Sequence, residues 1–452
     1  MIYQILRWIT QLAIHIYYRR IEINRPELLG IKGPLIIMSN HPNTLMDPLI
    51  LAALFKHQVG FLANASIFVN SMVNRVFRYL QVIPVYRQQD LAPGQVLDNT
   101  KSFGACYQHL EKNGSLMIFP EGSSIHELKL RKIKTGGIRI AFGAEDRNDF
   151  DLGIQILAVG LYYSNPLRFR SKVYLNFGEP FTLKNYQENY QKDEINTVQT
   201  LTAQLRKSME ELTIHIPDEG QEKLFIQIKK LFKKELTRDL RAEQNQIAEF
   251  NINREISSGI RFISQYYPES FDQLKDKINT LDQLDEQLHV KSNFERGRLK
   301  QWMLSFVKIL SMLLGLPFYL FGVIHNYIPY RIPRILAEKI THEKEYHASV
   351  SMVIGIFIFP LFYGIYLWSL TWIFSPPPPD FALALYFILM AITGLFSYSY
   401  YRFALRNSYF LRIVLSASKK DRLQHFLDLK KEVKRDLDWA KTQYVERNKN
   451  EK

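Results

Sequence analysis

Residues 34–48, PLIIMSNHPNTLMDP, join a short apolar run to a polar turn in a chain of 452 residues. The run Pro34–Ser39 predicts a buried strand. Four further runs have the same character, and helical patterns lie between them. The strands are expected at 34–39, 82–86, 115–119, 154–161 and 172–177, and the helices at 48–55, 67–79, 98–111 and 137–144. This alternation predicts an α/β domain over residues 21–185, with a mixed, largely parallel sheet.

The chain is basic, with 58 Lys and Arg against 44 Asp and Glu and a formal net charge of +14. Such an excess is typical of proteins that bind nucleic acid or anionic membranes. Residues 402–452 hold 14 of the basic and 7 of the acidic residues, directly after the most apolar region. This placement favours a membrane and argues against nucleic acid as a partner. The one cysteine, Cys106, excludes an intramolecular disulfide framework, and its apolar neighbours predict a core position.

Two uncharged apolar runs, Val350–Phe374 and Phe381–Tyr401, are each long enough to cross a hydrocarbon core of about 30 Å. Between them, residues 375–380 (SPPPPD) cannot continue a helix. Residues 350–401 are therefore predicted to form a transmembrane hairpin, with a buried soluble hairpin as the alternative. Lys and Arg flank the hairpin but are absent from its turn, so both ends are expected on the cytoplasmic side.

The segment Trp302–Pro329 is apolar but contains Gly315 and Pro317. We expect it to be re-entrant or to lie in the membrane plane, within a region 302–349 that ends in a basic loop. A single crossing is the alternative. Residues 186–301 are predicted to be a polar helical region, and residues 402–452 a basic cytoplasmic tail.

Residues 1–20 show a different pattern, in which polar residues recur every three to four positions among aliphatic ones. The polar positions are Gln4, Arg7, Gln11 and His15. The pattern predicts an amphipathic helix that lies at the membrane surface. A helix packed on the soluble domain is the alternative.

His41 directly follows the first buried strand, which is where α/β proteins place their active sites. A histidine can act as a general base near neutral pH. Asp47, on the turn into the next helix, is a candidate to accept the other ring N–H and so to orient His41.

Three further elements add polar groups. Glu121, Gly122 and Ser123 follow an apolar strand in the stretch FPEGSS, where a Glu on a tight turn can accept hydrogen bonds from substrate hydroxyls. Arg87 ends another strand, and Lys134 precedes a helix. Cations and backbone N–H groups at a helix start suit a phosphate monoester.

The order of these elements resembles the glycerolipid acyltransferases, which include glycerol-3-phosphate and lysophosphatidate acyltransferases. The resemblance covers roughly residues 21–182. The stretches Pro120–Ser124 and Tyr162–Arg170, with a membrane region after the domain, look most like the fungal-type glycerol-3-phosphate/dihydroxyacetone-phosphate acyltransferases. The family resemblance rests on Asn40-His41…Asp47, the strand ending in Arg87, Phe119-Pro-Glu-Gly122 and the apolar strand Ile156–Leu161.

The resemblance implies direct acyl transfer from a thioester of coenzyme A or acyl carrier protein, with no other cofactor and no metal. His41 would take the proton from the acceptor hydroxyl, and Asp47 would orient His41. Glu121 and Gly122, with Ser123 as a further donor, would bind the glycerol part. Arg87 and Lys134 would bind the phosphate.

Two departures from the family pattern stand out. Five residues, Pro42–Met46, separate His41 from Asp47 where four are usual. Ser123-Ser124 replaces the usual Thr-Arg, so one phosphate-binding cation is missing. Arg168 and Arg170 are candidates to replace it, besides Arg87 and Lys134.

The expected whole is a membrane-bound acyltransferase of phospholipid biosynthesis with its catalytic domain on the cytoplasmic face. Its expected partners are a lipid bilayer, preferably anionic, an acyl thioester and a glycerol-phosphate acceptor. A lysophosphatidate acyltransferase is the alternative within the family. A non-catalytic membrane scaffold that kept the fold is the alternative outside it.

Overall fold

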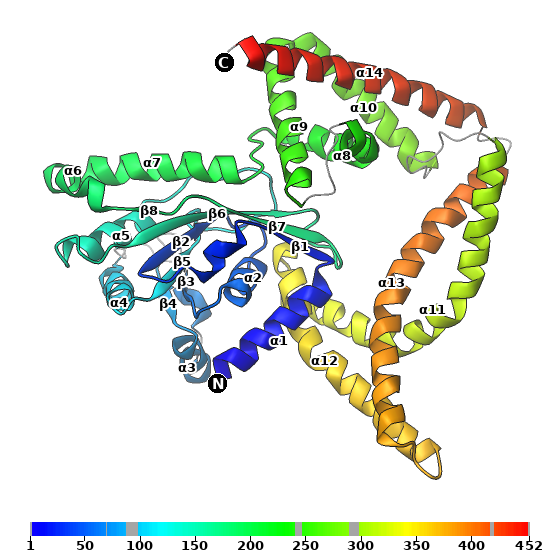
Figure 1. Ribbon diagram of the computed structural model, residues 1–452, viewed down its shortest axis with the longest axis horizontal. Helices are drawn as coiled ribbons and strands as arrows, with labels where there is room; N and C mark the ends of the chain where they lie inside the picture. The colour runs from blue at the N-terminus through cyan, green and yellow to red at the C-terminus, as the bar shows by residue number, and fades with distance from the viewer. Residues whose placement is uncertain are drawn as a thin grey trace. The chain divides into compact units, whose positions relative to one another are not determined.

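The computed structural model describes residues 2–68, 70–86, 98–239, 246–288, 298–415 and 420–450. The chain divides into two compact units. The first combines Met1–Pro217 with Ile340–Met352, and the second combines Asp218–Lys339 with Val353–Lys452. Figure 1 shows the sheet of the first unit and the long helices of the second.

In the described part of the first unit, eight strands form one sheet in the order β1-β7-β6-β2-β5-β3-β4, with β8 paired to β6. The pairs of β6 with β7 and with β8 are antiparallel, and the other pairs are parallel. The predicted mixed, largely parallel sheet is confirmed. Its strands are β1 (Arg20–Asn24), β2 (Leu35–Ser39), β3 (Gly60–Asn64), β4 (Val82–Val85), β5 (Ser115–Ile118), β6 (Gln155–Tyr163), β7 (Lys172–Phe177) and β8 (Phe181–Thr182).

Strand β2 is buried along its whole length because helices cover both faces of the sheet. Its alternate side chains enter two separate cores: Ile36 and Met38 face one, Leu35 and Ile37 the other. The first core is covered by α4 (Thr100–Glu111), α5 (Gly136–Asp146) and α7 (Glu194–Leu212). The second is covered by α1 (Ile2–Tyr17) and α2 (Met46–Leu54). The short α3 (Ser71–Tyr79) precedes β4, and α6 (Gln187–Lys192) precedes α7.

Helix α1 attaches to the unit through both apolar and polar side chains. Ile14 and Tyr17 are buried in the second core. The Arg7 Nε and Gln11 Nε2 atoms donate to the Ala53 carbonyl at the end of α2, at 3.1 and 2.6 Å. Other apolar residues of α1 point outward, and Trp8 is 63% exposed. The helix over residues 1–20 packs on the domain, as the alternative interpretation expected, and it also presents apolar residues outward. Its position at a membrane surface stays a prediction.

The beginning of α12 (Lys344–Ile373) belongs to the first unit although it lies far along the chain. Ala348 and Met352 are buried in the core that contains α2. Since α6 and α7 also pack on this unit, it extends to Pro217, beyond the expected boundary at 185.

The second unit contains a helical bundle of α8 (Glu219–Asp239), α9 (Gln246–Tyr266), α10 (Pro268–Leu288) and α14 (Lys420–Asn450). The expected basic tail is therefore largely a helix. Phe426 and Val433 of α14 are buried, and Lys277 of α10 pairs with Asp436 of α14 at 2.9 Å.

Three helices are long and apolar enough to cross a membrane, over Val307–Ile340, Lys344–Ile373 and Asp380–Leu405. The last two agree with the expected hairpin. The first lies within α11 (Arg298–Ile340), which runs unbroken through Gly315 and Pro317, and α13 spans Asp380–Leu415. Asn326 of α11 joins all three, because its Nδ2 donates to Met390 O at 3.0 Å and its Oδ1 accepts from the Tyr363 hydroxyl at 2.6 Å. The path of 302–329 relative to a bilayer stays a prediction.

Gly160 of β6 lies against the end of α7, and a Cβ there would overlap the Leu212 carbonyl oxygen, which also accepts from Asn176. Gly160→Ala is therefore expected to lower the free energy of unfolding by about 1–3 kcal/mol, since a packed backbone must shift. Gly104 of α4 has nothing within 4 Å of a built Cβ. As a matched control, Gly104→Ala is expected to stabilise by about 0.5–1 kcal/mol. Thermal unfolding of both variants checks the pair, and equal effects would contradict it.

Candidate active site

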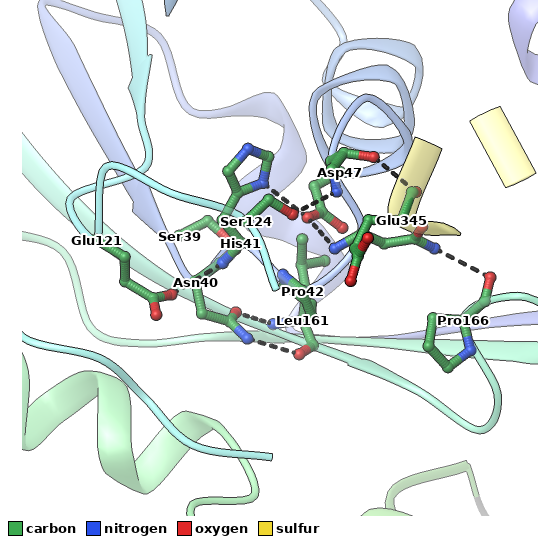
Figure 2. A network of polar contacts seen from close by, with 12 residues as sticks. Ser39, Asn40, His41, Pro42, Asp47, Glu121, Ser124, Leu161, Pro166 and Glu345 are labelled. Carbon is green, nitrogen blue, oxygen red and sulfur yellow. Dashed lines mark hydrogen bonds and ion pairs between the residues drawn. The ribbon is translucent and has the colours of Figure 1, made fainter. Parts of the chain in front are cut away.

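His41 and Glu121 meet at one edge of the sheet. His41 follows β2 and Glu121 follows β5, and these strands are parallel neighbours, so their carboxyl ends lie together. The backbone N–H of His41 donates to Glu121 Oε1 at 3.0 Å, as Figure 2 shows. Two stretches that the sequence singled out separately are therefore one site.

The five-residue spacing preserves the contact between His41 and Asp47. Nδ1 of His41 lies 2.8 Å from Oδ2 of Asp47. The intervening residues turn so that Asp47 sits in the first turn of α2, where the helix dipole favours a carboxylate. A proton on Nδ1 in this bond leaves Nε2 as the basic nitrogen. The His41 side chain is 19% exposed, so solvent reaches the ring.

Asp47 is fully buried, and two further donors compensate its charge. The Asn43 backbone N–H donates at 2.8 Å, and the Tyr163 hydroxyl donates to Oδ1 at 2.5 Å. Burial and the neighbouring carboxylate raise the pKa of Tyr163 well above its usual value, so the hydroxyl stays protonated. Sequence analysis missed Tyr163, because it ends an apolar strand and its position opposite Asp47 depends on the pairing of β6 with β2.

Contacts with Phe119 and hydrogen bonds of the neighbouring Asn40 further restrain the His41 ring. It stacks on Phe119, with ring centroids 4.0 Å apart and planes 17° from parallel. The Asn40 side chain donates to Leu161 O at 2.9 Å and accepts from Leu161 N at 2.7 Å. These bonds fix the end of β2 against β6 and leave the ring little freedom to rotate away from Asp47.

Glu121 connects two parts of the site through hydrogen bonds. Its two oxygens accept backbone N–H bonds from His41 and from Arg131, each at 3.0 Å. Each oxygen keeps a second lone pair for a ligand hydroxyl. Gly122 has a φ of 72°, and a Cβ at this position would collide with the Lys134 ammonium group. Lys134, which the sequence proposed as a phosphate ligand, therefore lies directly over the Glu121-Gly122 turn.

The structure adds one cation that sequence analysis missed. The Arg131 guanidinium lies 3.3 Å from the Ser123 hydroxyl and pairs with Glu127 at 2.5 Å. Arg170 instead donates to the carbonyls of His15 and Ile16 at the end of α1. Arg87 lies outside the described residues. Lys134 and Arg131 are thus two cations that the structure places beside the turn.

Other candidate groups are not part of this site. Burial raises the pKa of the Cys106 thiol to about 12, in agreement with a core position. Within the described ranges, no group of three or more His, Cys, Asp or Glu side chains is arranged to hold a metal ion.

Residues 11–162, which contain this site, match the family model described as acyltransferase. These residues form an acyltransferase domain. The two glycerol-3-phosphate O-acyltransferases of Saccharomyces cerevisiae, numbered 2 and 1, are 33% and 29% identical to it over 123 and 125 residues. Each of these matches covers 27% of this chain and only 16% of the yeast protein.

Two further proteins are similar to the chain over longer stretches. An uncharacterised acyltransferase of Schizosaccharomyces pombe is 22% identical over 302 residues, which cover 48% of this chain and 45% of that protein. The crystal structure of the 1-acyl-sn-glycerophosphate acyltransferase PlsC of Thermotoga maritima is 19% identical, with a TM-score of 0.33, and covers 46% of this chain and 79% of that chain.

The acyltransferase domain has a titratable group whose protonation can be followed. Burial raises the pKa of the Glu121 carboxyl, although N–H bonds from Arg131 and His41 lower it in part. A pKa raised by folding means that the protonated form contributes stability below the pKa of the unfolded chain. That stability is lost as the pH rises through the raised folded value.

Lowering the pH from 8 to 5 is therefore expected to raise the melting temperature of the wild type relative to Glu121→Gln, which cannot take up the proton. Melting temperatures of both proteins at several pH values provide the measurement. Glu188→Gln, at an exposed position, is the control for the loss of one carboxylate. A constant difference between the wild type and Glu121→Gln across this pH range would show that folding does not shift the Glu121 carboxyl.

Proposed function

We propose that the chain transfers a fatty acyl group from an acyl thioester to a hydroxyl of glycerol 3-phosphate, with His41 as the general base. The observation that carries this proposal is the 2.8 Å contact between His41 Nδ1 and the buried Asp47. It leaves Nε2 free to accept a proton, in a ring that its neighbours hold in place.

The reaction needs few groups. His41 Nε2 takes the proton from the acceptor hydroxyl, and the oxygen forms a bond to the thioester carbonyl carbon. The carbon–sulfur bond then breaks, and the departing thiolate receives the proton from His41. Asp47 keeps its hydrogen bond to Nδ1 and stabilises the imidazolium between these steps. The thioester is a substrate here, and the proposal requires no other cofactor.

A phosphorylated acceptor fits the cations near the turn. Lys134 lies over Gly122, and Arg131 reaches Ser123, so two positive groups flank the turn that follows β5. Arg131 stands near the place where the family pattern has an Arg and this chain has Ser124. The names of the two yeast relatives favour glycerol 3-phosphate over lysophosphatidate as the acceptor.

A membrane location fits both the donor and the product, because long acyl chains partition into the bilayer. The outward apolar face of α1 and the three long apolar helices support attachment to a membrane. We further propose that the domain faces the cytoplasm, since Lys and Arg flank the apolar hairpin and are absent from its turn.

The proposed base is tested by His41→Ala in the full chain, purified in detergent. Long-chain acyl-CoA or acyl carrier protein thioester is supplied with glycerol 3-phosphate, dihydroxyacetone phosphate or lysophosphatidate in parallel. The variant is expected to lose about 10²–10⁴-fold in turnover, since it lacks the group that accepts the proton. His425→Ala, an exposed histidine of α14, is the control and should match the wild type. Equal turnover in His41→Ala would exclude His41 as the base. Absence of wild-type turnover with every pairing would favour the scaffold alternative.

The phosphate contact is tested by Lys134→Ala. Its KM for the phosphorylated acceptor is expected to rise about tenfold, because an exposed charge-assisted hydrogen bond contributes about 1–2 kcal/mol. Lys132→Ala, an exposed lysine of the same loop, should leave the KM unchanged. If both variants raise the KM equally, the effect is general charge attraction and Lys134 makes no specific contact.

A further inference from the structure

Thr44 lies in the middle of the five-residue loop between His41 and Asp47, and the residue is only 4% exposed. Its φ is 35°, a conformation that is uncommon for a residue branched at Cβ and that Gly or Asn adopts more easily. Strain of this kind persists only where surrounding contacts require it. The contacts of Thr44 therefore identify what holds the loop in this shape.

Thr44 makes hydrogen bonds from both its backbone and its side chain. Its backbone N–H donates to the Ser124 hydroxyl at 2.7 Å, and its Oγ1 donates to the Glu345 carbonyl at 2.8 Å. Figure 2 shows the second bond reaching the start of α12. Ser124 belongs to the loop that also carries Glu121, whereas Glu345 lies 301 residues further along the chain.

The segment that contains Glu345 is firmly seated on the same core. Ala348 and Met352 of α12 are buried with Met46 and Ile50 of α2, the helix whose first turn carries Asp47. The bond from Thr44 thus connects the His41–Asp47 loop to the start of α12, which packs against α2 where that loop ends. This helix, Lys344–Ile373, is itself one of the three that are long and apolar enough to cross a membrane.

We propose that Thr44 is a positioning residue that ties the His41–Asp47 loop to the first turn of α12. The alignment of the base then depends on the segment from which α12 leaves the α/β unit. The loop is short, and Asn43 within it donates to Asp47, so a shift at Thr44 displaces the Asp47 contact directly. The kinetic part of this proposal rests on the proposed acyl transfer.

Three substitutions separate positioning from bulk stability. Thr44→Val keeps the shape and removes the hydroxyl, and Thr44→Ser keeps the hydroxyl. Thr44→Gly relieves the positive φ but removes the bond to Glu345. The matched control is Thr202→Val, because Thr202 is a buried threonine of α7 whose hydroxyl donates to the Val198 carbonyl at 2.7 Å, away from the site.

In the full chain in detergent, Thr44→Val and Thr44→Gly are expected to lower kcat at least tenfold and to change either KM less than twofold, because misalignment of a base slows the chemical step. Thr44→Ser is expected within threefold of the wild type, and Thr202→Val within twofold. Thr44→Gly should also melt no lower than Thr44→Val. Wild-type kcat in Thr44→Val, or an equal loss in Thr202→Val, would overturn the proposal.

A second measurement does not depend on turnover. Hydrogen–deuterium exchange is followed in peptides that cover residues 42–47 and 344–349 of the same proteins. Thr44→Val is expected to raise exchange in both peptides at least threefold, and Thr202→Val in neither. Unchanged exchange at 344–349 would overturn the link even if acyl transfer is confirmed. Raised exchange at both peptides with no wild-type turnover would uphold the link and refute the acyl-transfer function alone.

Discussion

The site depends on a single buried charge, the Asp47 carboxylate. A carboxylate without water is costly to bury unless hydrogen bonds replace its hydration. Asp47 receives these bonds from His41, Asn43 and Tyr163, which come from the loop before α2 and from strand β6. Losing any of these three hydrogen bonds would destabilise the buried carboxylate. The loop conformation in which all three bonds form is therefore favoured. The orientation of His41 is thus a consequence of the hydrogen bonds that the buried Asp47 carboxylate requires.

The parts of the fold that follow from local pattern were predictable from the sequence. The buried strands β2, β5 and β6 are largely apolar runs, and His41 and Glu121 follow two of them. The strands β1 and β3 were missed because each is short, partly exposed and without such a run, and β8 was missed because it has only two residues. The contribution of α12 to the first unit was also out of reach, since contacts across 301 residues leave no periodic signal.

The side chains that complete the site could not be predicted from the sequence, because their positions also depend on contacts between distant segments. In the sequence, Tyr163 looks like a core residue because it ends an apolar strand. Only the register of β6 against β2 brings its hydroxyl to Asp47. Arg131 stands ten residues after Glu121, and its approach to Ser123 depends on the path of an irregular loop. Helix α1 shows the opposite case, because its polar pattern was visible but its direction was not. Ile14 and Tyr17 are buried in the core, and two polar side chains of α1 bind one carbonyl of α2. The other apolar residues of the helix therefore face outward.

The two departures from the family pattern become one feature in three dimensions. The longer loop places Thr44 at a positive φ with a backbone N–H that needs an acceptor, since buried donors without partners are costly. Ser124, one of the two serines that replace Thr-Arg, supplies that acceptor at 2.7 Å. A long, charged arginine at this position could not accept the bond, because a guanidinium has only donors. The serine at this position thus serves the loop that carries His41 and Asp47, and the structure places the positive groups of Arg131 and Lys134 beside the same turn.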